Sequence, residues 1–151
     1  MTEPKATTIV KAIETTLLVI LKSSGFFTDL GLSVHRGFYA HAINDSNAKF
    51  PLIAIQPETE GPPDRKGGKS KLPTQLRLVI AVDHSEQASD VLRACLADIR
   101  RAVDLNEDSI DALIVNGSLE FGIAEFVPAQ ETNFSLAALP VSFSFVEHYE
   151  D

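Results

Sequence analysis

The sequence has little of what several common protein classes require. It contains one cysteine, Cys95, so it can form no disulfide within the chain and no zinc site built from cysteines. Its longest strongly apolar run, Leu17–Leu21, is far shorter than the roughly 20 residues that span a bilayer. The first residues lack the basic and apolar regions of a signal peptide. These absences predict a soluble protein that is not secreted.

Positive charge is also scarce. The chain has 13 Lys and Arg residues against 21 Asp and Glu residues, which gives a formal net charge of −8 at pH 7. General binding to DNA or to an anionic membrane requires basic patches, so this balance argues against both and leaves room only for local nucleic-acid contacts. The length of 151 residues and the ordinary share of hydrophobic residues, 44%, predict one folded domain.

Catalytic and cofactor signatures are missing as well. Gly68-Lys69-Ser70 imitates the end of a phosphate-binding P-loop, but the first glycine of that motif would stand at position 63, which is Pro63, and Pro73 replaces the helix that should follow. No Gly-x-Ser-x-Gly elbow or His-Glu-x-x-His motif is present, and the histidines are isolated: His35, His41, His84 and His148. We therefore expect no enzyme, no cofactor and no metal.

Two helices are predicted from apolar residues at three- and four-residue spacing. The first covers residues 5–23, and Gly25 follows as a left-handed residue that ends it. The second covers residues 85–103, with Ser85 as N-cap. Cys95 falls at the centre of its apolar stripe and is interpreted as a small buried residue, whereas Asp98 falls off the stripe.

Five strands are predicted from apolar runs and from alternation of apolar and polar residues: 32–38, 52–56, 75–82, 119–126 and 137–146. Residues 39–50 are expected to form a loop, Gly122 to mark a bulge, and residues 106–112 to contain one short helical turn. Pro140 lacks an N–H donor and should force the last strand to an edge or bulge at that point. The expected fold is a single α+β domain with a mixed, mostly antiparallel sheet of four to five strands and two main helices on one face.

The stretch between two of these strands, residues 57–73, is long, polar and without apolar periodicity. Structureless loops above about 12–15 residues are uncommon inside compact domains, so we interpret it as a protruding β-hairpin arm. Its charges are segregated, with glutamates on the outgoing limb and basic residues at and after the tip: Arg65, Lys66, Lys69 and Lys71. The basic tip is either a solvated loop or a contact for an acidic partner, and another copy of this acidic chain is one such partner. A head-to-tail contact of that kind generates rings when the rotation closes.

The order of these elements resembles the tail terminator proteins of long-tailed bacteriophages and their prophage relatives, over most of the chain. The resemblance rests on an opening helix with Ile9, Ile13 and Leu17, a Gly25 after it, a Pro51–Ile55 strand, a long loop, a Leu78–Val82 strand, a helix with Val91-Leu92 and Ile99–Val103, and closing strands that end at Val141–Phe145.

The resemblance implies a non-enzymatic virion protein, made in the bacterial host cytoplasm and placed in the tail. It would form a hexameric ring that caps the tail tube, ends its polymerisation and docks the head-tail connector protein, while DNA passes through without specific binding. We expect the arm and the acidic C-terminal tail (Glu147, Tyr149, Glu150, Asp151) to contact other subunits. The alternatives are a different head-tail joining or minor tail protein, and a small cellular partner-binding domain.

Overall fold

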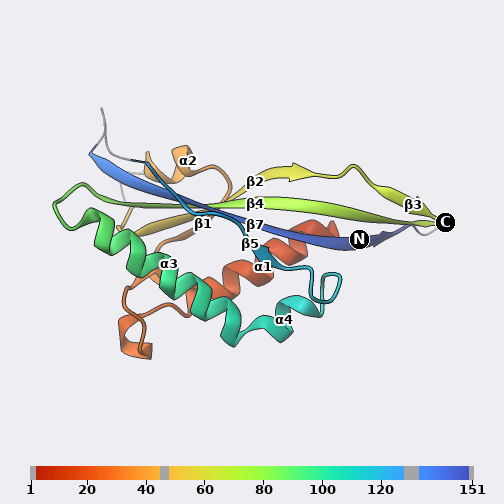
Figure 1. The fold of residues 1–151 in the computed structure, drawn as a ribbon, viewed down its shortest axis with the longest axis horizontal. Coiled ribbons are helices and arrows are strands. Elements are labelled where there is room, and N and C mark those ends of the chain that lie inside the picture. The colour runs from red at the N-terminus through yellow and green to blue at the C-terminus, as the bar shows by residue number, and fades with distance from the viewer. Residues whose placement is uncertain (1–2, 45–47, 128–132, 150–151) are drawn as a thin grey trace.

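A mixed seven-stranded sheet forms the centre of the computed structural model, which describes residues 3–44, 48–127 and 133–149 (Figure 1). The sheet order is β1-β2-β4-β7-β5, with β3 also paired to β4 and β6 also paired to β7. Only the β1–β2 pair is parallel among the described strands. The strands are β1 (Val34–Arg36), β2 (Leu52–Glu60), β3 (Asp64–Lys66), β4 (Lys69–Asp83), β5 (Glu120–Phe121), β6 (Glu125–Val127) and β7 (Phe134–His148).

Helices cover mainly one face of this sheet, which we call the inner face. Figure 1 shows α1, α3 and α4 on this side and the short α2 on the opposite, outer side. The helices are α1 (Lys5–Leu18), α2 (Tyr39–Ile43), α3 (Ala88–Leu105) and α4 (Glu107–Asp111), with two 3-10 turns, η1 (Lys22–Ser24) and η2 (Leu30–Leu32). None of the helices in the described ranges has both the length and the apolar character needed to cross a membrane.

Strict alternation in β4 and β7 explains the core. These strands pair antiparallel along their whole length, from Lys69 opposite His148 to Asp83 opposite Phe134. Every second side chain therefore points to the inner face, where Leu78, Ile80 and Phe145 are almost fully buried. Each such side chain contributes about 1.5–3 kcal/mol through its burial. Because β4 and β7 are 15 residues long, the sheet extends past the helices at one end (Figure 1).

The predicted fold class is confirmed: an α+β domain with a mixed sheet, two main helices on one face and a β-hairpin arm. The described residues form seven strands instead of four to five, partly because the predicted strand 119–126 is divided into β5 and β6. Gly122 lies at the division, where its N–H donates to the Pro140 carbonyl at 2.8 Å and a Cβ atom would stand 3.0 Å from the Pro140 ring.

The expectation of an edge or bulge at Pro140 agrees with the pairing at that point. As a whole β7 lies inside the sheet, between β4 and the short β5 and β6, but neither β5 nor β6 pairs with Pro140. In a strand, the N–H and C=O groups of one residue point to the same edge. The Pro140 carbonyl accepts the Gly122 N–H, so this edge of Pro140 faces away from β4. The missing N–H of Pro140 therefore faces the interval between β5 and β6. No hydrogen bond to β4 is lost.

The helical regions also differ from the predictions. The first helix ends at Leu18, and Gly25 (φ 89°) ends η1 instead. The chain turns early because Gly31 packs against the end of α1, where its N–H donates to the Ile20 carbonyl at 2.8 Å. Helix α3 begins at Ala88 without a side-chain cap from Ser85. Within the predicted loop 39–50, the structure forms α2, whereas the predicted short turn at 106–112 is confirmed as α4.

Candidate interaction surfaces

The arm is an extension of the sheet and ends in a tight turn. Strands β3 and β4 form its tip, residues 64–71, with Lys66 paired to Lys69. Between them Gly67 and Gly68 have φ values of 51° and 81°, as a two-residue type I′ turn requires. On β4, Ser70, Leu72 and Thr74 continue the buried inner face into the arm. The arm is therefore an ordered structure that can hold its side chains in fixed positions.

The structure sorts the four predicted basic residues onto two faces. Residues directly opposite each other in an antiparallel pair share a face. Lys66 faces Lys69, and Lys71 lies two residues further on the same side, so these three form what we call the lysine face, on the outer side of the sheet. Asp64 faces Lys71 and so places one carboxylate on this face. Arg65 faces Ser70 and so lies on the inner side.

The basic side chains of the tip are unpaired. In the part of the chain that the structure describes, none of the four makes a hydrogen bond or an ion pair. Like charges directly opposite each other, as at Lys66 and Lys69, destabilise a strand pair. The tip therefore keeps a local positive charge, since its four basic residues outnumber Asp64, and the Lys66–Lys69 pair costs folding free energy, which favours a role in binding.

The acidic tail lies beside the tip of the same chain. Glu147 faces Ser70, the Tyr149 N–H donates to the Gly68 carbonyl at 2.8 Å, and the Tyr149 hydroxyl donates to Glu147 at 3.2 Å. Glu150 and Asp151 lie outside the described residues. The sequence did not predict this pairing, because the apolar alternation that marks β7 ends at Val146 and polar residues complete the strand.

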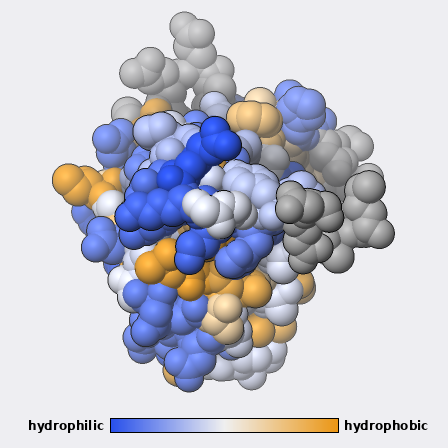
Figure 2. Space-filling model, turned by 90° about the vertical axis from the view of Figure 1, so that its right-hand side faces the viewer, coloured by the Kyte–Doolittle hydropathy of each residue, from blue (hydrophilic) through white to orange (hydrophobic). Residues whose placement is uncertain are grey.

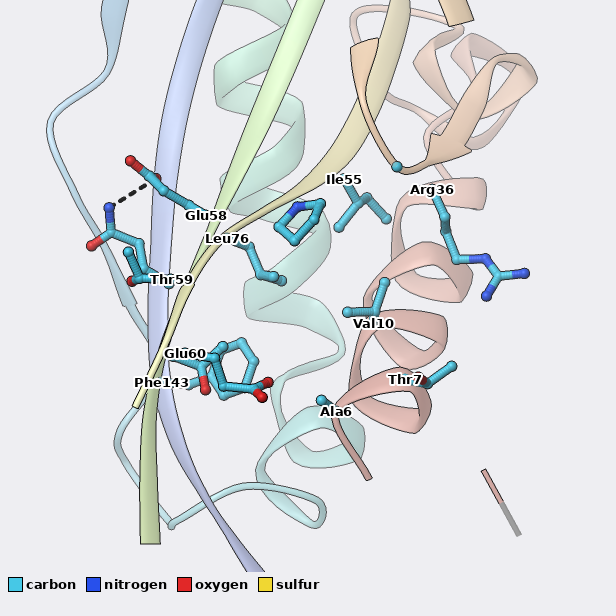
Figure 3. A pocket seen from close by; sticks show the side chains of 14 residues that line it. Ala6, Thr7, Val10, Arg36, Ile55, Glu58, Thr59, Glu60, Leu76 and Phe143 are labelled. Atoms are coloured by element: carbon cyan, nitrogen blue, oxygen red, sulfur yellow. Dashed lines mark hydrogen bonds between the residues drawn. The ribbon is translucent and has the colours of Figure 1, made fainter. Parts of the chain in front are cut away.

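A groove of about 570 Å³ lies at the base of the arm, between β2 and the first turns of α1 (Figure 3). We call it the base groove. Its walls are mostly apolar and include Val10, Ile55, Leu76 and Phe143. A register shift between Pro57 and Thr59 bends β2 at this point. Sequence reasoning missed the groove because it depends on how α1 packs against the sheet.

Some polar residues of the base groove have hydrogen-bond or ion-pair partners within the chain. Glu58 accepts hydrogen bonds from Gln75 and Arg77, each at 2.9 Å, and the pKa of its carboxyl is lowered, chiefly by the Gln75 bond. Arg36 pairs with Glu14 at 3.4 Å, and Figure 3 shows its guanidinium pointing away from the opening.

Glu60 and Thr74 are two polar residues of this groove whose side chains have no partner among the described residues. They face each other across β2 and β4, and Phe143 lies opposite Thr74 on β7. The Thr74 hydroxyl is buried and has no hydrogen-bond partner among the described residues, and the exposed Glu60 carboxylate has none there either. Figure 3 shows Glu60 beside the Phe143 ring on the side that faces α1. The groove thus combines apolar walls with an unpaired acceptor of cationic groups.

Seen along the arm, the end of the molecule has a hydrophilic tip with an apolar patch beside it (Figure 2). Among residues 3–44, 48–127 and 133–149, no group of three or more His, Cys, Asp or Glu side chains is placed to hold a metal ion. Cys95 is fully buried, as predicted, and burial raises the pKa of its thiol to about 12. The geometry of the arm and groove is suited to binding a protein surface.

Comparison with known proteins gives a likeness to solved structures. No family model and no curated protein matches the sequence. The fold is similar to that of a chain in a solved structure described as "Virion of native gene transfer agent (GTA) particle", with a TM-score of 0.51 and 10% sequence identity. The likeness is one of fold. It covers 92% of this chain and 98% of that chain.

Proposed function

We propose that this protein is a structural component of a phage-like virion and, within that class, a tail terminator. The observation that carries the proposal is the similarity in fold, over nearly the full length of both chains, to a chain of a gene transfer agent virion. The order of elements in the sequence, which resembles tail terminators, supports the finer assignment.

In this role the protein forms a hexameric ring on the last ring of the tail tube. The ring ends tube polymerisation and offers a surface to the head-tail connector protein. The unpaired basic tip at one end of an acidic chain supports a head-to-tail contact, the type of interface that closes into rings. A net charge of −8 also suits a channel through which DNA passes without binding, since acidic walls repel phosphate.

The subunit contacts in this ring involve the arm and the tail. Arg65, Lys66, Lys69 and Lys71 meet an acidic surface of the next subunit, and Glu147, Tyr149, Glu150 and Asp151 lie at the same interface. The function is non-enzymatic and needs no cofactor. A different head-tail joining or minor tail protein is the second candidate, because the description of the structural neighbour names a virion and no part of it.

Deletion of the gene from a genome that carries the complete particle separates these two candidates. Loss of a terminator leaves tube polymerisation unchecked, so we expect tails of variable and excessive length without attached heads, and recovery when the gene is supplied in trans. Electron microscopy of the lysate measures both features. Tails of normal length in the deletion strain would contradict termination and favour the second candidate.

A further inference from the structure

We propose that the base groove receives the lysine face of the arm tip from a second copy of this chain. The inference rests on the proposed ring and names the contact that would build it. It starts from two sets of side chains without partners among the described residues, the three lysines of the tip and the Glu60–Thr74 pair of the groove.

The groove needs a partner that is both apolar and cationic. Its walls at Val10, Leu76 and Phe143 offer contact to a hydrocarbon chain, and Glu60 offers an unpaired carboxylate at the mouth (Figure 3). The arginines nearest to it already have acidic partners, since Arg36 pairs with Glu14 and Arg77 with Glu58. The groove therefore keeps a negative charge that the described residues of its own chain do not neutralise.

A lysine side chain meets both requirements. Its four-carbon stem packs along apolar surface while its ammonium group stays at the polar end, and that group carries three donors and no acceptor. One ammonium group can donate to the Glu60 carboxylate. The groove volume of about 570 Å³ lies within the range of roughly 300–1,000 Å³ found for small-molecule binding clefts, so there is room in it for a lysine side chain.

The tip of the same chain does not reach this groove. The lysine face points to the outer side of the sheet, whereas Glu60 and Thr74 lie on the inner side. Arg65 does lie on the inner side, but its partner Ser70 is four residues from Thr74 along β4, a separation of roughly 13 Å at 3.3 Å per residue. The β4 strand between them is held on both edges and cannot fold back. A tip lysine that fills the groove therefore comes from another molecule.

A second copy is the occupant that the charges favour. Two acidic chains repel each other as wholes, so a contact between them forms only where a local positive surface meets a local negative one. Tip and groove are different surfaces of one chain, which makes the contact heterologous and able to continue from subunit to subunit. The apolar walls of the groove give the contact stability that an exposed ion pair lacks.

The test uses two variants of the full chain, each with one half of the contact removed. The tip variant carries Lys66→Ser, Lys69→Ser and Lys71→Ser and keeps the glycine turn and Ser70. The groove variant carries Glu60→Lys. Each alone is expected to weaken self-association by about tenfold or more, and a 1:1 mixture is expected to form two-chain complexes, because one intact tip meets one intact groove. Sedimentation velocity measures all of these masses.

The matched control is Glu125→Lys, which makes the same charge change at an exposed residue of β6 outside the groove and should leave association unchanged. Thermal unfolding checks that all variants are folded. If Glu60→Lys associates like the unchanged chain while the tip variant does not, the tip docks elsewhere; the docking inference is then overturned and the ring stands. A mixture that stays at the mass of one chain overturns it too. An unchanged chain that is always monomeric overturns both ring and docking.

Discussion

At the scale of single residues, Asp98 shows how a buried charge orders a segment far away in the chain. Periodicity places it off the apolar stripe of α3, yet its exposed fraction is 1%. Its carboxylate accepts the Thr28 N–H and hydroxyl at 2.8 Å each and the Phe27 N–H at 3.0 Å. The connection between η1 and η2 is thereby fixed to α3. A sequence pattern cannot predict this, because the donors are 70 residues away and mostly belong to the backbone.

Replacing Asp98 with alanine should lower the free energy of unfolding by about 3 kcal/mol, since hydrogen bonds to a charged group are lost and buried donors remain unpaired. Urea denaturation measures the change. The matched control is Asp104→Ala on the exposed side of the same helix, which should change the free energy by about 0.5 kcal/mol or less. Equal effects of the two substitutions would show that the Asp98 contacts contribute nothing.

At the scale of elements, the arm shows where sequence patterns end. Residues 75–82 of β4 and 137–146 of β7 are predictable because large apolar side chains alternate with other residues. Beyond Gln75 the inner positions are Thr74, Leu72 and Ser70, which lack this signal, and yet they are buried. Their burial comes from pairing with β7 and β3, so only tertiary structure reveals that the arm is part of the sheet.

The turn at the tip can be tested by two substitutions of one glycine. Gly67→Asn should preserve the hairpin, because asparagine accepts the positive φ of a type I′ turn, whereas the β-branched side chain of Gly67→Val should open it. Hydrogen exchange at the amides of Lys66 and Lys69 reports the difference. Slow exchange in the valine variant would mean that β7, and not the turn, holds the tip.

At the scale of the whole molecule, the sequence predicted the fold class, the arm and its basic tip from local patterns. The base groove was not predictable, because Glu60, Thr74, Phe143 and Val10 come together only when β2, β4, β7 and α1 are packed. The same holds for the sorting of the basic residues, since the strand register decides that three lysines share a face and Arg65 does not. The basic residues are close together in the sequence, and the fold places the three lysines on one face of the arm.

The central claim is that this chain acts as a ring of subunits. Sedimentation velocity of the unmodified chain, over a concentration series that reaches the high micromolar range, tests it most directly. The account predicts a species with six times the mass of one chain, visible as six-fold rings in negative stain. A mass of one chain at every concentration would contradict it.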